Sequence, residues 1–284
     1  LLEDREGSLT ISDLSAPARE NRFVRSTKDA PGFGFTRSTV WSRFTIENRL
    51  QERIEYYLEV QYPLLDHITL FIPESSGDFS TMEGGDNLPF AARAIQYRNP
   101  IFPIALEPGQ QRTFYLRCRT SSSLTLPLTL HSPSCLAGHI SSTQSLIGLY
   151  CGILLVMMIY NLFIYVSIRE IPYLHYVLFV ASFLLFQLSL NGMAFQYLWP
   201  EHVWWANTSV PFFIFLSYVW ASQFTRSMLN TSRNVPRLDM LLKGCIGLAI
   251  FGLALSLFGS YSLAIRLATL LVLSVWIHIL SGYL

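Results

Sequence analysis

Seven residues in the first half of the chain have side chains of the types that bind small polar ligands. They alternate with apolar residues along four short segments, and they are Trp41, Arg43, Tyr57, Glu59, His67, Tyr115 and Arg117. An aromatic ring stacks on the C–H face of a sugar, while arginine, glutamate and histidine side chains hydrogen-bond its hydroxyl groups. The pattern therefore predicts a binding face for a small carbohydrate-like ligand. The alternative is that these rings cover a sheet or pack beneath a loop, because aromatic residues are favoured cross-strand partners.

Carboxylates cluster in the segment 74–86, which reads ESSGDFSTMEGGD. Asp78, Glu83 and Asp86 are weak candidates for calcium ligands, because Ca²⁺ prefers carboxylate oxygens. Their spacing does not match a calcium-binding loop, so a solvated turn is the favoured interpretation. Calcium is the one cofactor that the sequence brings into consideration.

No group of residues in this half has the pattern of a catalytic site. The histidines His67, His131 and His139 are scattered, and the sequence shows no nucleophile motif, metal-ligand spacing or phosphate-binding glycine loop around them. We therefore expect neither enzymatic activity nor a metal centre. The charge balance of +1 lacks the basic excess of a nucleic-acid-binding surface, so a nucleic-acid partner is not expected.

Cys118 and Cys135 are the two cysteines of this half. In an oxidising compartment they could form a disulfide. Cys118 falls on the apolar side of its segment, so a buried free thiol is the alternative. Both interpretations stay open at the level of sequence.

The elements that must position these residues are short strands. Four segments alternate between apolar and polar residues, namely 40–46, 54–60, 66–72 and 112–118, and weaker candidates are 9–11, 79–81, 101–105 and 124–130. Alternation with a period of two predicts strands with one buried face. About eight short strands without a convincing helix predict an all-β sandwich of the jelly-roll type.

The same alternation predicts which residues form the core. The apolar set is Val40, Phe44, Ile46, Ile54, Tyr56, Leu58, Val60, Ile68, Leu70, Ile72, Phe114, Leu116 and Cys118. The seven candidate ligand-binding residues belong to the opposite set.

The second half of the chain has a different composition. Residues 1–143 contain 14 Lys/Arg and 16 Asp/Glu, whereas residues 144–284 contain six and three. The segment 144–168 has no charged residue. A helix of this length is long enough to cross about 30 Å of hydrocarbon. We therefore predict a soluble domain at 1–135, a bent linker at 136–143 that contains Gly138, and an all-α membrane bundle at 144–284.

Five membrane spans are predicted in the bundle, at about 144–168, 172–190, 204–224, 241–258 and 261–284. If the sandwich lies outside, the inside loops carry Arg169, Arg226, Arg233, Arg237 and Lys243, while the outside loops carry no Lys or Arg. The positive-inside rule therefore places the sandwich outside, and the predicted spans make a lipid bilayer a partner of the chain. The chain has no initiator Met and ends within an apolar run, and we interpret it as a fragment of a longer protein.

Small and polar residues within the spans are candidates for helix packing or signalling. Gly148 and Gly152 form a GxxxG pair that permits close helix approach, including approach by a second protomer. Asn161, Tyr165 and Gln187 lie on stripes that should face the bundle interior. Interhelical hydrogen bonding is the simpler interpretation of the polar residues, and a switching role is the other.

Several short motifs resemble one known family. They include GFGFT at 32–36, WSRF at 41–44, YPLLDHITLF at 62–71, YNLF at 160–163 and YLHY at 173–176. In their order and spacing the chain resembles bacterial seven-transmembrane receptors with diverse intracellular signalling modules. The resemblance covers nearly the whole chain, with a periplasmic jelly-roll sensor followed by the receptor-type transmembrane domain.

The resemblance implies a receptor of the bacterial inner membrane whose periplasmic domain binds a small ligand. It also implies a cytoplasmic output module, a histidine kinase of a two-component system or a diguanylate cyclase of cyclic-di-GMP signalling, which this chain does not contain. Two alternatives are a transporter or channel with an outer lid domain and a membrane-anchored carbohydrate-binding module. The first predicts charges or broken helices near mid-membrane, and the second needs only one span.

Overall fold

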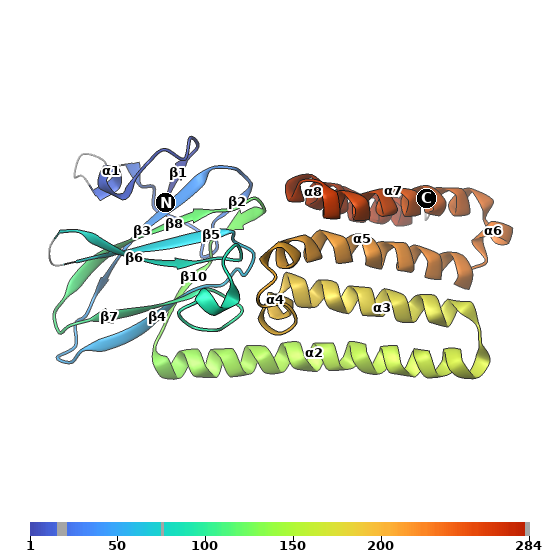
Figure 1. The fold of residues 1–284 in the computed structure, drawn as a ribbon, viewed down its shortest axis with the longest axis horizontal. Coiled ribbons are helices and arrows are strands. Elements are labelled where there is room, and N and C mark those ends of the chain that lie inside the picture. Colours follow the sequence, from blue (N-terminus) through green and yellow to red (C-terminus); the bar gives the residue numbers. More distant parts are fainter. Residues whose placement is uncertain (16–21, 75–76, 282–284) are drawn as a thin grey trace. The chain divides into compact units, whose positions relative to one another are not determined.

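The computed structural model describes residues 1–15, 22–74 and 77–281, and the side chains of residues 1–15, 22–74 and 77–271. Figure 1 shows the order of the elements along the chain, with the strands first and the long helices after them. The chain divides into two compact units, residues 1–141 with 195–204 and residues 142–194 with 205–284. Each unit is described separately below.

The first unit is built from antiparallel strands. They are β1 (Leu2–Asp4), β2 (Gly32–Phe35), β3 (Thr39–Glu47), β4 (Ile54–Val60), β5 (His67–Pro73), β6 (Phe79–Gly84), β7 (Ile101–Leu106), β8 (Gln111–Arg119), β9 (Ser123–Thr125) and β10 (Leu128–His131). One sheet has the order β1-β3-β8-β5-β6 and the other has the order β10-β4-β7, while β2 pairs with β9. The chain crosses between the two large sheets after β3, β4, β6 and β7, as expected of a jelly-roll-like sandwich.

The core of the sandwich lies between the two large sheets. Val40, Ile68 and Leu116 of the five-stranded sheet share one buried cluster with Leu58 and Val60 of the other sheet. Twelve of the 13 residues predicted from the alternation are part of this cluster or pack against it, the exception being Tyr56. The predicted all-β sandwich and its core are therefore confirmed.

The four strongest strand predictions are confirmed, and the weaker ones differ in detail. The candidate at 9–11 is wrong, because Ile11 begins the short helix α1 (Ile11–Ser15). The candidate at 124–130 is two strands, β9 and β10, and Pro127 lies between them. A proline lacks the N–H that a strand interior needs, which explains the interruption.

Cys118 and Cys135 do not form a disulfide, because both are free thiols. Cys118 is buried in the sandwich core, and burial raises the pKa of its thiol above the ordinary value. Cys135 is exposed at the start of the next helix. The interpretation of Cys118 as a buried free thiol is the one that the structure supports.

The predicted bent linker at 136–143 is wrong, because helix α2 runs without interruption over Pro133–Ile168. Ser132 caps its start, with its Oγ accepting the N–H of Cys135 at 3.3 Å. Pro133 follows at the first helical position, where its fixed φ and missing N–H cost nothing. The cap and the proline together explain why the helix begins directly after β10, despite Gly138.

The remaining helices are α3 (Ile171–Leu190), α4 (Met193–Tyr197), α5 (Val203–Met228), α6 (Thr231–Asn234), α7 (Pro236–Phe258) and α8 (Tyr261–Ser281). Four of them overlap the other predicted spans, and the short α4 and α6 lie in the segments between them. Among the described residues, α2, α3 and α7 are long and apolar enough to cross a membrane. Helix α5 is long enough but contains a polar stretch at 207–209, which lowers its hydropathy.

In the second unit, helices α5, α7 and α8 share a buried cluster. Phe215 of α5 and Ala249 of α7 pack against Ala264 and Ala268 of α8, all fully buried. Gly252 of α7 lies directly under the Phe215 ring, so that a side chain at this position would collide with it. Small residues therefore set the close approach of these helices, as is usual within membranes.

Candidate ligand-binding site

The seven residues predicted to form one binding face lie on two different sheets. Trp41, Arg43, His67, Tyr115 and Arg117 belong to β3, β5 and β8 of the five-stranded sheet, whereas Tyr57 and Glu59 belong to β4 of the other. The prediction of a single shared face is therefore wrong. Alternation assigns a side of each strand but does not reveal which strands share a sheet.

Trp41 and Tyr115 lie beneath the N-terminal segment. Trp41 is fully buried, and it forms a cluster with Tyr115 and with Leu14 of α1. Its ring stacks on Phe71 at a centroid distance of 5.4 Å, and the Arg117 guanidinium lies 5.7 Å from its centre. The alternative of rings packed beneath a loop therefore describes Trp41 and Tyr115, which form a second small core.

Glu59 and Tyr57 also have structural neighbours. Glu59 is fully buried, and its Oε2 lies 2.9 Å from Nε2 of His131. Tyr57 packs against a cluster that contains Tyr97 and Leu136. Neither residue presents the open ring or free carboxylate that a surface sugar site requires.

His67 and Arg43 are the two predicted residues that line surface depressions away from these clusters. His67 borders a polar pocket with Arg37, Asp66 and Arg119, and its Nε2 lies 3.3 Å from the Asn87 amide nitrogen. Arg43 borders a larger groove, which shares no lining residue with the His67 pocket. The two depressions are separate.

The groove beside Arg43 is the largest of these depressions, with a volume of about 460 Å³. The apolar residues that line it include Phe44, Ile46, Leu58, Leu128 and Leu130, and the charged residues that line it are Arg25, Lys28, Asp29 and Arg43. This volume falls within the usual range for small-molecule sites, about 300–1,000 Å³. A lining with many apolar residues and with three basic residues against one acidic residue suits a ligand that has one hydrophobic face and a negative charge.

The three calcium candidates do not assemble. Asp78 and Glu83 are exposed, whereas Asp86 is buried. Within the described ranges, the one cluster of three or more metal-ligating side chains contains none of them. Separation by burial is the physical reason, because one ion would have to bind both a surface and an interior carboxylate.

Asp86 belongs instead to a buried polar group with Arg93. Burial raises the pKa of Asp86 to about 8, with Asp66 adding to the effect, and burial lowers the pKa of Arg93 to about 10. Arg93 donates to the carbonyl oxygens of Tyr97 and Arg98 at 2.8 and 2.7 Å. The sequence gives no periodic signal for this interior arginine, because it lies in an irregular segment.

The segment 195–204 is part of the same compact unit as the sandwich. Phe195 meets the Phe90 ring edge-on at 5.5 Å, Arg93 lies over both rings, and the Phe90 N–H donates to the Pro200 carbonyl at 3.1 Å. The charge pattern predicts that this segment is an outside loop. Its contacts with the sandwich agree with that orientation, because both must then lie on the same side of the membrane.

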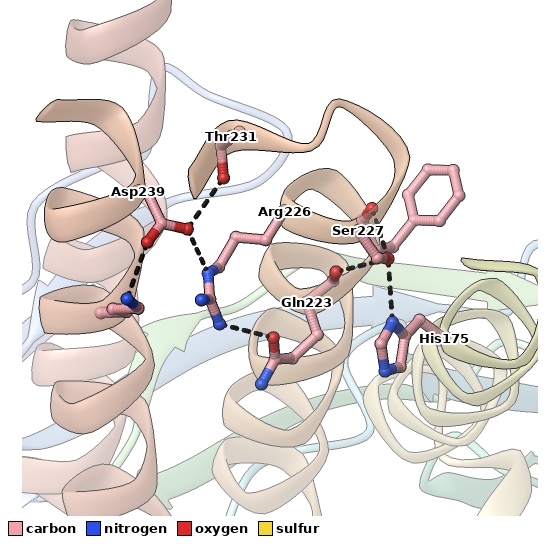
Figure 2. Close-up of polar contacts among 8 residues, drawn as sticks. His175, Gln223, Arg226, Ser227, Thr231 and Asp239 are labelled. Atoms are coloured by element: carbon pink, nitrogen blue, oxygen red, sulfur yellow. Dashed lines mark hydrogen bonds and ion pairs between the residues drawn. The ribbon is translucent and has the colours of Figure 1, made fainter. Parts of the chain in front are cut away.

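A polar network connects helices α5, α6 and α7 of the second unit (Figure 2). Asp239 accepts hydrogen bonds from Arg226 Nε at 2.8 Å and Thr231 Oγ1 at 2.9 Å, and Lys243 Nζ lies 2.8 Å from its other oxygen. Arg226 also donates to Gln223 at 2.8 Å. Asp239 therefore holds the short α6 turn and two long helices together at one point.

Helix α3 contacts the end of α5, close to this network, through His175. Nδ1 of His175 lies 2.9 Å from Oγ of Ser227 (Figure 2). The His175 ring stacks on Trp220 at a centroid distance of 6.1 Å. The cationic residues of the network are among those predicted to lie inside. The sequence predicts their orientation but not the network around Asp239, because Asp239 is 13 residues from Arg226. The one local signal is the spacing of four residues between Asp239 and Lys243, which is typical of an ion pair along a helix.

The predicted packing residues of the spans have mixed environments. Space around Gly148 and Gly152 is open within the described part of the chain, so the close approach that this pair permits is not made within one protomer. Asn161 donates to the Met157 carbonyl of its own helix at 2.8 Å. Gln187 donates to the Tyr150 hydroxyl at 3.1 Å, linking α3 to α2. Tyr165 lies near the C-terminal end of α2 and is partly buried.

Family models match both parts of the chain. The model described as 7TMR-DISM extracellular 2 matches residues 1–132, and the model described as 7TM diverse intracellular signalling matches residues 143–284. The chain belongs to this family of seven-transmembrane receptors. A comparison with curated proteins finds no match. The resemblance stated from the sequence motifs is confirmed.

Membership identifies this receptor as a membrane protein with an extracellular N-terminal domain and a membrane-embedded signalling domain. The boundary between the two models, at 132–143, coincides with the start of helix α2. In the receptor, α2 is thus the first covalent connection between the extracellular domain and the membrane.

Proposed function

We propose that this receptor detects a small, carbohydrate-like ligand that carries an acidic group, and that it binds this ligand in the groove beside Arg43. The observation that carries the proposal is the groove itself, which is lined by Phe44 and several leucines together with three basic residues, Arg25, Lys28 and Arg43, and one acidic residue, Asp29. An apolar lining favours the C–H face of a sugar, and guanidinium groups pair with carboxylates in a two-point geometry. A uronic-acid oligosaccharide has both features.

The receptor acts in the inner membrane of a bacterium, with its sandwich in the periplasm, and controls a histidine kinase or diguanylate cyclase module. A ligand that binds one state of the receptor better than another shifts the population toward that state. Helix α2 supports this relay because it continues from the sandwich into the bundle without a break. The Asp239 network also supports the relay, since it couples helices α5, α6 and α7. A homodimer is part of the proposal, because the open sides of Gly148 and Gly152 leave room for a second α2.

A binding experiment tests the ligand and the groove together. The chain in lipid nanodiscs is titrated with acidic and neutral oligosaccharides while thermal unfolding is followed. We expect acidic saccharides to raise the thermal unfolding midpoint. Arg43→Ala and Lys28→Ala should each weaken the affinity derived from this titration at least tenfold. Arg49→Ala is the matched control, because Arg49 is exposed, pairs with Glu47 at 2.8 Å and lies outside the groove. Equal binding by all three variants would remove the groove from consideration.

A further inference from the structure

Three potential metal ligands from distant positions in the chain meet beside the start of helix α2. Glu59 comes from β4, His131 from the end of β10 and His139 from the second turn of α2. One ligating atom from each residue lies within 4.8 Å of the other two. The Glu59 carboxylate oxygen Oε2 lies 2.9 Å from Nε2 of His131 and 3.5 Å from Nε2 of His139.

These separations fit the coordination shell of a small metal ion. Zinc binds imidazole nitrogen and carboxylate oxygen at about 2.0–2.1 Å, which in a tetrahedral shell places ligand atoms roughly 3.3 Å apart. The two distances measured from Oε2 bracket this value. The imidazole rings are nearly parallel, with centroids 5.1 Å apart, so both can approach one ion from neighbouring directions.

The surroundings hold the carboxylate and one imidazole in place. Asn99 donates to the other Glu59 oxygen at 2.7 Å, and Gln61 donates to Oε2 at 3.3 Å. Sγ of Cys135 lies 3.8 Å from Nδ1 of His131, the ring nitrogen that faces away from Glu59. Such partners behind the ligands orient them and tune their basicity, and metal sites depend on them.

The buried Glu59 carboxylate needs a positively charged partner. The Glu59 side chain is fully buried and that of His131 is 6% exposed, and a buried carboxylate without a compensating partner destabilises the folded state strongly. The His139 side chain is 33% exposed, which provides a route by which an ion can enter from solvent. Two nitrogens and one oxygen favour a transition metal over Ca²⁺ or Mg²⁺, which prefer all-oxygen shells.

We propose that Glu59, His131 and His139 bind a divalent transition-metal ion, with Zn²⁺ the best match, and that solvent completes the shell. The ion fastens the first turns of α2 to β4 and β10 of the extracellular domain. Metal binding stands independently of the groove and its ligand. Its effect on signalling rests on the proposed function, because α2 is there the connection to the membrane.

Metal titration of the full chain in nanodiscs tests this inference. After removal of metals by a chelator, Zn²⁺ is titrated against a chromophoric competitor, and Co²⁺ is added separately to record its visible absorption. We expect one ion per chain and tetrahedral Co²⁺ bands. Glu59→Gln and His139→Ala should each weaken Zn²⁺ binding at least 100-fold and abolish the bands.

His202→Ala is the matched control, since His202 is an exposed histidine outside the cluster, and it should retain one ion with unchanged affinity. His139→Ala guards against misfolding, because this side chain is partly exposed, and its unfolding midpoint without metal should match that of the parent chain. Stoichiometric binding that survives both ligand substitutions, or no uptake of Zn²⁺ by the parent chain, would overturn the inference and leave a carboxylate–imidazole pair. Saccharide binding is read separately, so failure of one proposal is distinguishable from failure of the other.

Discussion

At the scale of single residues, burial decides the role of most polar side chains in the extracellular domain. Glu59, Asp86 and Arg93 all lie in the interior, where each needs a hydrogen-bond or charge partner. The ligand-site prediction assumed that polar residues opposite the apolar set face solvent. In a sandwich whose outer faces are themselves covered by α1 and α2, that assumption fails for Trp41 and Glu59.

Asp86 gives the extracellular domain a measurable pH dependence. Its pKa rises from 3.8 to about 8 on folding, so the folded state holds a proton that the unfolded chain releases. The free energy of unfolding contributed by this group is therefore fully present below about pH 4 and is lost as the pH rises toward 8. Asp86→Asn should remove this contribution.

The measurement is the unfolding midpoint of the chain between pH 5 and pH 9. The midpoint of the parent relative to Asp86→Asn should fall by several degrees over that range, while the difference between the parent and Asp78→Asn should stay constant. Asp78 suits the comparison because its side chain is exposed. A pH profile for Asp86→Asn that parallels the parent would contradict this assignment.

At the scale of elements, helix ends carry much of the specific structure. Ser132 and Pro133 begin α2 directly after the last strand. The network around Asp239 joins the end of α5, the start of α6 and the first turns of α7. Both features depend on local chemistry at a terminus, where the apolar pattern is weakest. The helices themselves follow from long apolar runs.

Asp239 and Lys243 offer a comparison within one ion cluster. Asp239→Asn leaves Arg226, whose side chain is only 22% exposed, without its charge partner, and should cost about 1–3 kcal/mol. Lys243→Gln removes a partner that is 59% exposed, which should cost about 0–1 kcal/mol. Chemical unfolding of the two variants in detergent measures the difference. If both variants lose the same stability, the buried pair is not what holds α5 to α7.

At the scale of the whole molecule, the orientation follows from independent observations. The positive charges favour an outside sandwich, the family model describes residues 1–132 as extracellular, and the segment 195–204 belongs to the same unit as the sandwich. One topology satisfies all three.

Cysteine labelling checks this topology. In intact spheroplasts, a membrane-impermeant maleimide should label Cys135, which is exposed at the start of α2, and should leave the buried Cys118 unmodified. The raised pKa of Cys118 slows its reaction further, because the thiolate is the reactive form. Cys135→Ser should remove most of the signal. Labelling of Cys135 only after the membrane is permeabilised would place the sandwich on the cytoplasmic side.

Patterns along the sequence are enough to predict the two-part architecture, the core strands, the long helices and the family. These follow from hydrophobic periodicity and from runs of uncharged residues, which are properties of neighbouring positions. The period of two in 54–60 is enough to predict β4 and to assign Leu58 and Val60 to the core.

Which polar residues come into contact is seen only in the folded structure. Glu59 and His131 are 72 positions apart, and no local pattern connects them; the pairing of β10 with β4 brings them to adjacent positions. The same pairing places β4 in a different sheet from β3, β5 and β8, so the seven predicted binding residues lie on two sheets. It also leaves Glu59 buried. Sites depend on strand order and on what covers each sheet, and these are set by contacts between segments that are distant in the sequence.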